Sequence, residues 1–187
     1  MRILVIADRG PSRPIKEILA EQPIDVIVTL GDLELSDIRY LELVTDIPKL
    51  GVYGNHCSGM YMPEIGMENM HMRAKEVKGL VFGGFEGCVK YKNSSAKMYT
   101  QEEASAMFDT FPKVDVMLVH CPPYGVNDDT TDISHTGFIG LRDYVERERP
   151  KYLFHGHTYP KEHELITQLG DTQIRYVFGE RVIEIAP

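Results

Sequence analysis

The stretch KYLFHGHTYP, residues 151–160, places a short apolar run directly before two histidines, a threonine and a tyrosine. A continuous apolar run of this length is typical of a strand that is buried on both faces of its sheet. Four other runs also end at polar side chains, and they lie within residues 2–7, 25–30, 47–54 and 114–119. The repeated pattern predicts five buried strands that each deliver a polar residue at their carboxyl end.

Amphipathic segments between these runs predict helices over residues 14–22, 36–45, 100–109 and 137–148. Strands that alternate with helices favour an α/β sandwich with mixed sheets and the helices outside. A hairpin is expected from 71–77 and 80–84, and an antiparallel finish from 163–169, 172–178 and 181–185. We expect one domain over residues 1–187, because single cores usually span about 100–200 residues.

The composition excludes several classes of protein. The formal net charge is -8, and no run of lysine and arginine exceeds two residues, which argues against bulk nucleic acid as a partner. The apolar run near the N-terminus is too short for a membrane span or a signal segment, so we expect a cytoplasmic protein with no membrane partner. The three cysteines show no paired spacing and are expected to be reduced thiols. The sequence leaves a homo-oligomer open.

The polar residues at the predicted strand ends have the chemistry of metal ligands. Because the carboxyl ends of parallel strands meet at one edge of a sheet, we expect these side chains to gather there. Carboxylates, an amide oxygen and imidazoles form a mixed set of oxygen and nitrogen donors, which suits manganese, iron or zinc better than calcium or magnesium. The residues concerned are Asp8, Asp32, Asn55 with His56, His120, and His155 with His157.

Four short motifs resemble the calcineurin-like metallophosphoesterase family in their order and rough spacing over nearly the whole chain. They are GD at 31–32, GNH at 54–56, VH at 119–120 and GHT at 156–158. The resemblance implies a four-layer α/β/β/α sandwich with two mixed sheets and two divalent metal ions at the strand ends. It also implies that Asp32 bridges both ions, that one ion is completed by Asn55, His120 and His157, and that Asp8 belongs to the other.

The sequence departs from the family pattern at two histidines of that other ion. Gly10 and Tyr159 stand where the family has these histidines, which makes the chain an atypical member. With Asp8, Asp32 and water as the remaining ligands, a second ion would be held loosely. We therefore predict one tight site for a divalent transition metal and a second site that is weak or empty. His155 precedes the ligand position on its strand and is expected to make a buried hydrogen bond instead.

The function implied by the resemblance is a metal-dependent phosphoesterase that hydrolyses a small phosphomonoester or phosphodiester through a metal-bound hydroxide. His56 would be the general acid, although Cys57 follows it where the family usually has an acidic residue. Cys57 itself is expected to be a packing or rim residue. Arg9, His135 and Tyr159 are candidates for contacts with a phosphorylated substrate.

Two other interpretations stay open. One is a non-catalytic scaffold or ligand-binding protein on a degenerate fold of the same family, which Gly10 and Tyr159 favour. The other is an accidental resemblance in a plain α/β binding domain, which would make Asn55, His120 and His157 unrelated strand-end residues.

Overall fold

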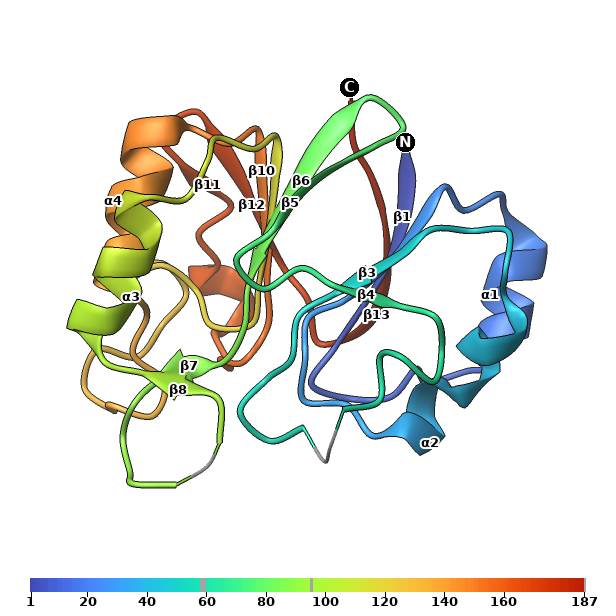
Figure 1. Ribbon diagram of the computed structural model, residues 1–187, viewed down its shortest axis with the longest axis horizontal. Helices are drawn as coiled ribbons and strands as arrows, with labels where there is room; N and C mark the ends of the chain where they lie inside the picture. Colours follow the sequence, from blue (N-terminus) through green and yellow to red (C-terminus); the bar gives the residue numbers. More distant parts are fainter. Residues whose placement is uncertain (58–59, 95, 187) are drawn as a thin grey trace.

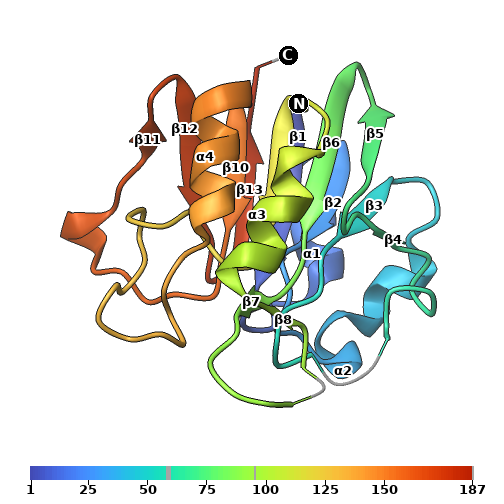
Figure 2. The same cartoon turned by 60° about the vertical axis from the view of Figure 1, so that its left-hand side comes forward.

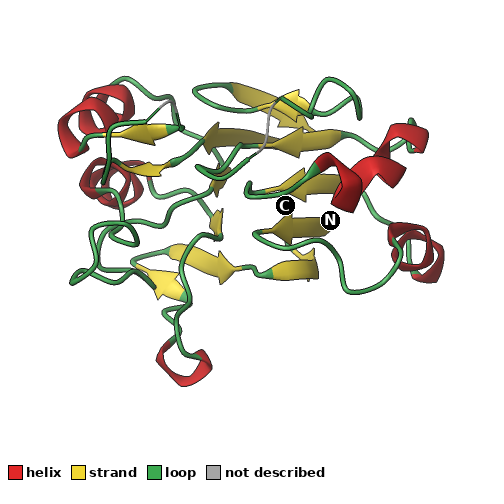
Figure 3. Ribbon diagram, turned by 90° about the horizontal axis from the view of Figure 1, so that it is seen from below, coloured by secondary structure: helices red, strands yellow, loops and turns green. Residues whose placement is uncertain are grey.

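Two β-sheets lie face to face in the computed structural model of the chain, and helices cover the outer face of each (Figure 1). The structure describes residues 1–57, 60–94 and 96–186. Viewed from below, the strands lie in the middle of the molecule with helices on both sides (Figure 3). The expected four-layer α/β/β/α sandwich is confirmed.

The first sheet has the strand order β13-β1-β2-β3-β4. Strands β1 to β4 are parallel, and β13 is antiparallel to β1. The carboxyl ends of β1, β2 and β3 therefore meet at one edge. The strands are β1 (Arg2–Ala7), β2 (Val26–Thr29), β3 (Lys49–Gly51), β4 (Glu68–Asn69) and β13 (Gly179–Glu184).

The second sheet has the order β11-β12-β10-β9-β6-β5, with β6, β9, β10 and β12 parallel and the two edge strands antiparallel. Its strands are β5 (Ala74–Val77), β6 (Leu80–Phe85), β9 (Val116–Val119), β10 (Tyr152–His155), β11 (Gln168–Leu169) and β12 (Thr172–Tyr176). A separate two-stranded sheet pairs β7 (Cys88–Val89) with β8 (Met98–Tyr99). The parallel strands β9 and β10 bring their carboxyl ends to the same edge.

The helices divide between the two outer faces. The first sheet is covered by α1 (Ile15–Glu21), α2 (Leu35–Ile38) and the 3-10 helix η1 (Arg39–Leu43). The second is covered by α3 (Gln101–Asp109) and α4 (Ile139–Glu148), which lie side by side (Figure 2). A second 3-10 helix, η2, spans Glu162–Glu164. None of the helices in the described ranges is long and apolar enough to cross a membrane.

Successive side chains of β1 point to opposite faces of the first sheet, so this strand contributes to two hydrophobic cores. Ile3 and Val5 belong to the core between the two sheets, whereas Leu4 and Ile6 belong to the core that packs against α1. All four side chains are fully buried, and burial of each such side chain stabilises the fold by about 1.5–3 kcal/mol. Because both faces of β1 are buried, the strand needs apolar residues at successive positions, which explains the continuous apolar run in the sequence.

The structure corrects three local predictions. The helix expected over 36–45 begins at Leu35 and changes to a 3-10 helix at Arg39. The strand expected over 163–169 is shortened to Gln168–Leu169, because 162–164 forms η2. The antiparallel finish is wrong for the last strand, since β13 crosses to the first sheet, pairs with β1 and adds Ile183 to the core between the sheets.

Candidate metal centre

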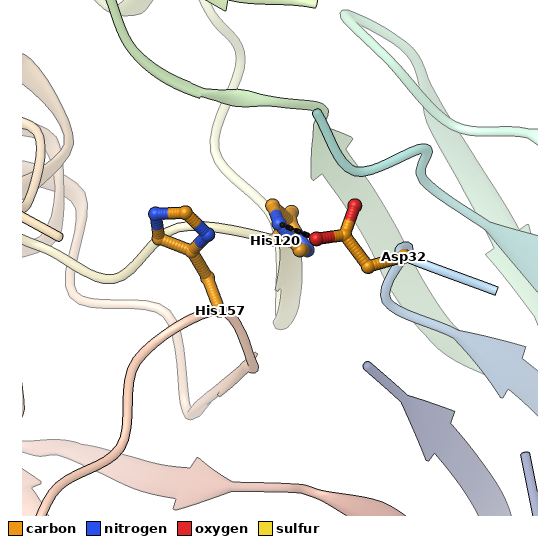
Figure 4. A group of neighbouring side chains, drawn as sticks. All are labelled: Asp32, His120 and His157. Carbon is orange, nitrogen blue, oxygen red and sulfur yellow. Dashed lines mark ion pairs between the residues drawn. The ribbon is translucent and has the colours of Figure 1, made fainter. Parts of the chain in front are cut away.

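Three side chains from three strand ends converge at the edge where the two sheets meet. Asp32 follows β2, His120 follows β9, and His157 follows β10, so both sheets contribute. One ligand atom from each of the three lies within 4.8 Å of the others (Figure 4). Such a spacing lets the three atoms share one cation.

His120 is completely buried and is held in one orientation by the opposite sheet. Its Nδ1 lies 2.7 Å from the carbonyl oxygen of Leu30 and donates to it. That bond leaves the lone pair of Nε2 facing Asn55 Oδ1 at 3.1 Å and Asp32 Oδ2 at 3.4 Å. Three electron-rich atoms this close repel one another unless a proton or a cation lies among them.

The negative charges around His120 also favour a proton or a cation at its Nε2. Burial lowers the pKa of its imidazole, but the carboxylates of Asp32 and Asp8 outweigh burial and raise that pKa. Without a metal ion, a proton on Nε2 relieves the repulsion. A divalent cation would relieve it with two positive charges, so the residues present fit a metal ion.

Asp32 remains ionised in this surrounding. Its Oδ1 accepts a hydrogen bond of 2.7 Å from the backbone N–H of His56, and its Oδ2 faces His120. Burial pushes the pKa of Asp32 upward, but the His120 charge and these hydrogen bonds overcome it and bring the pKa to about 2. The carboxylate is therefore available as an anionic ligand at neutral pH.

His157 presents one ring nitrogen to the centre. Its Nε2 donates to the carbonyl oxygen of Ser134 at 2.8 Å, so the other nitrogen, Nδ1, carries the free lone pair. In Figure 4 one ring nitrogen of His157 faces His120 and Asp32 and the other points away. Burial, and then the charge of His120, lower the pKa of His157 to about 3, which keeps the imidazole neutral, as a metal ligand must be.

Asp8 lies beside this group and has a different partner. Both of its carboxylate oxygens accept from the backbone N–H of His157, at 3.0 and 2.9 Å, which joins the two sheets. Gly156 permits the approach, because a Cβ there would lie 2.3 Å from Asp8 Oδ2. Burial raises the pKa of Asp8 to about 6, against the opposing effects of His120 and the His157 N–H.

Gly10 and Tyr159, the two positions where the sequence differs from the motifs of the family that it resembles, have different surroundings. A Cβ at Gly10 would lie 2.9 Å from the side chain of Asp37, which caps α2 by accepting from the backbone N–H of Glu34. A histidine at position 10 would therefore displace Asp37. Tyr159 is 69% exposed, and its ring packs against His135 and Phe178, each with 5.8 Å between centroids.

The remaining predicted site residues differ in how deeply they are buried. Asn55 is buried with its amide oxygen at His120, as described above, whereas the side chain of His56 is exposed. His135 is partly exposed, and its Nδ1 is 2.7 Å from Asp132 Oδ2. Arg9 is exposed, and its guanidinium has no hydrogen bond or ion pair with any residue in the described ranges. The structure brings Asn55 into the metal group and leaves His56 and Arg9 open to solvent.

His155 and Cys57 have contacts that sequence patterns alone do not reveal. His155 is fully buried and its Nε2 lies 3.0 Å from the Asn127 amide nitrogen, which confirms the predicted buried hydrogen bond. Cys57 Sγ accepts from the backbone N–H of Asp32 at 3.2 Å and of Gly54 at 3.1 Å. It thus ties the loop of Asp32 to the loop of Asn55, a role beyond packing. The sequence signal for this role is the position of Cys57 directly after the GNH motif.

The comparisons with known proteins show the fold. No protein-family profile and no curated protein matches the sequence. Among solved structures, the chain is similar to TT1561 of Thermus thermophilus, with a TM-score of 0.64 and 15% identity over 95% of this chain and 89% of that one. It is also similar to Vacuolar Protein Sorting 29 from Cryptosporidium parvum, with a TM-score of 0.51 and 14% identity over 95% and 74% of the two chains. At these identities the likeness shows a shared fold, that of the metallophosphoesterases.

The raised pKa of Asp8 predicts a pH-dependent cost to the metal-free protein. Between its ordinary pKa of 3.8 and the raised value of about 6, the folded state holds a proton that the unfolded state releases, so this carboxyl lowers stability as pH rises through that window. Asp8→Asn keeps an acceptor for the His157 N–H and removes the titration. Urea unfolding in EDTA should therefore show Asp8→Asn gaining, relative to wild type, about 2 kcal/mol between pH 4 and pH 7. An unchanged difference across that range would contradict the assignment.

The contacts of Cys57 predict a local effect on two amides. In Cys57→Ala the N–H groups of Asp32 and Gly54 lose their acceptor, so their hydrogen exchange should accelerate about tenfold or more, a change of about 1.4 kcal/mol or more. Cys57→Ser restores an acceptor and should recover most of the protection. Amide exchange followed by NMR measures both. Equal protection in the alanine and serine variants would show that the thiol only fills space.

Proposed function

We propose that the protein is a metal-dependent phosphoesterase that hydrolyses a small phosphomonoester or phosphodiester at this centre. The observation that carries the proposal is the convergence of unshared electron pairs from Asp32, Asn55 and His120, with the free nitrogen of His157 beside them. Two imidazoles, a carboxylate and an amide oxygen form a donor set that suits a divalent manganese, iron or zinc ion. When bound, such an ion supplies a Lewis acid for a phosphoryl oxygen and acidifies a water molecule.

The proposal assigns one tight ion and a weak or empty second site. Support comes from Asp8, whose two oxygens are already engaged by the His157 N–H, and from Gly10, where Asp37 leaves little space for a larger side chain. Tyr159 offers a hydroxyl in place of an imidazole. A second ion would depend mainly on Asp8 and Asp32.

The surrounding residues have roles that follow from their exposure. His56 lies at the solvent side of Asp32 and is the candidate to give a proton to the leaving oxygen, which requires access to substrate. Arg9, His135 and Tyr159 are candidates for holding the phosphorylated substrate, and the free guanidinium of Arg9 suits a phosphate oxygen. We expect the protein to act in the cytoplasm, and its charge of -8 disfavours bulk nucleic acid as a partner.

A second candidate function is a non-catalytic scaffold or ligand-binding protein. It is favoured by Gly10 and Tyr159, which depart from the family pattern at the second ion, and by a fold shared with a protein named for vacuolar sorting. In this second function the protein would still bind one ion tightly but would not catalyse hydrolysis.

Metal content and hydrolysis distinguish the two functions. After loading with Mn²⁺ and dialysis, the protein should retain about one ion per chain, because a single donor set is complete among the residues that the structure describes. It should hydrolyse an aryl phosphodiester, and His56→Ala should lower kcat by about 10²–10⁴-fold through loss of the general acid. His120→Ala should remove both the ion and the activity.

His163→Ala is the matched control, because this imidazole is exposed and contacts only Glu164 within the described ranges. It should leave metal content and rate unchanged. One retained ion with no hydrolysis of any phosphoester would favour the scaffold, and two retained ions would contradict the single tight site.

A further inference from the structure

A polar cavity of about 420 Å³ lies next to the candidate metal centre. Its walls come from the segment that directly follows His157 and from the loop that follows β9, and they include Thr158, Tyr159, Asp128 and Asp129. His135, which also lines the cavity, has its ring centroid 5.5 Å from that of His157. The cavity thus lies beside the candidate metal ligand His157.

Tyr159 connects the cavity with the centre. Its ring packs on the ring of His135, with 5.8 Å between the centroids, and the ring of His135 lies in turn against that of His157. A phosphoester whose phosphoryl group lies at the metal centre would therefore direct its remaining part toward this cavity.

The charges of the walls define what can enter. The lining contains three carboxylates, those of Asp128, Asp129 and Glu164, and one ammonium group, that of Lys161, which pairs with Glu164 at 3.3 Å. Only one oxygen of Asp128 and one of Asp129 accept hydrogen bonds, from Gly137 N–H and from Thr131 respectively. The other two oxygens accept none from the described residues and keep lone pairs for a ligand donor.

The wall of the cavity also contains a residue whose buried hydroxyl lacks a partner among the described residues. Thr158 lines the cavity, is 2% exposed, and its Oγ1 has no hydrogen-bond partner among the described residues. Buried hydroxyls in folded proteins are rarely left without a partner. Tyr159, which is 69% exposed, adds an aromatic ring to the lining of the cavity, and this ring packs against Phe178.

We propose that this cavity binds the leaving group of the phosphoester, and that this group is uncharged and rich in hydroxyls, as in a sugar or the ribose of a nucleoside. The inference rests on the proposed phosphoesterase function. Carboxylates accept hydrogen bonds from hydroxyls, aromatic rings pack against the C–H face of a sugar, and the negative walls repel a second anionic group.

Two probes of nearly equal size test the charge preference, glucose 1-phosphate and glucuronic acid 1-phosphate, which share the pyranose ring and differ by one carboxylate. Calorimetric titration of the Mn²⁺-loaded protein should give a Kd for glucose 1-phosphate about fivefold or more below that for glucuronic acid 1-phosphate. Glu164→Lys, whose native side chain is 55% exposed, should abolish or invert that ratio. Glu146→Lys is the control, because Glu146 is 51% exposed on α4 and pairs with Arg142 away from the cavity, so it should leave the ratio unchanged.

Inorganic phosphate separates the possible failures. If phosphate binds the Mn²⁺-loaded protein but the two probes bind equally, or the two lysine variants behave alike, the leaving-group subsite is wrong while the metal centre stands. If phosphate does not bind at all, the result contradicts both the proposed phosphoesterase function and the leaving-group subsite that rests on it.

Discussion

The hydrogen bond from His120 Nδ1 to the carbonyl oxygen of Leu30, 2.7 Å long, crosses from one sheet to the other and fixes the chemistry of the site. It sets the tautomer of a fully buried imidazole and turns Nε2 toward Asn55 and Asp32. The paired contacts from the His157 N–H to Asp8 hold the same two layers together. Because the sandwich itself aligns these donors, the ligand geometry exists before any ion binds, which is the condition for a tight metal site.

Backbone strain accompanies this arrangement. Asp8, Asp32 and His157 have φ values of 59°, 53° and 69°, in a region that costs a residue other than glycine about 1–2 kcal/mol. Gly54 allows the turn of Asp32, since a Cβ at position 54 would lie 2.0 Å from Asp32 Oδ1. Burial of the strands on both faces offsets the strain, so the core between the sheets maintains conformations that the site residues would not adopt alone.

Much of this could be predicted from sequence because the pattern is local. A buried strand followed by a polar residue is visible at Asp32, His120 and His157, and parallel pairing then brings the strand ends to one edge. Contacts between distant segments could not be predicted. The crossing of β13 to the first sheet and the approach of Asp37 to Gly10 depend on how the layers pack, and no residue pattern records them. The two hydrogen bonds of Cys57 depend in the same way on two loops meeting.

The central claim is that folding prepares His120 to bind a metal through Nε2 and His157 to bind it through Nδ1. Titration of ¹⁵N-histidine-labelled protein with Zn²⁺, followed by long-range ¹H–¹⁵N NMR of the imidazoles, tests it directly. One equivalent of Zn²⁺ should shift the resonances of His120 Nε2 and His157 Nδ1, while the two opposite nitrogens keep their protons and their hydrogen bonds to Leu30 and Ser134. Zinc binding that leaves both imidazoles unshifted, or that shifts the opposite nitrogens, would contradict it.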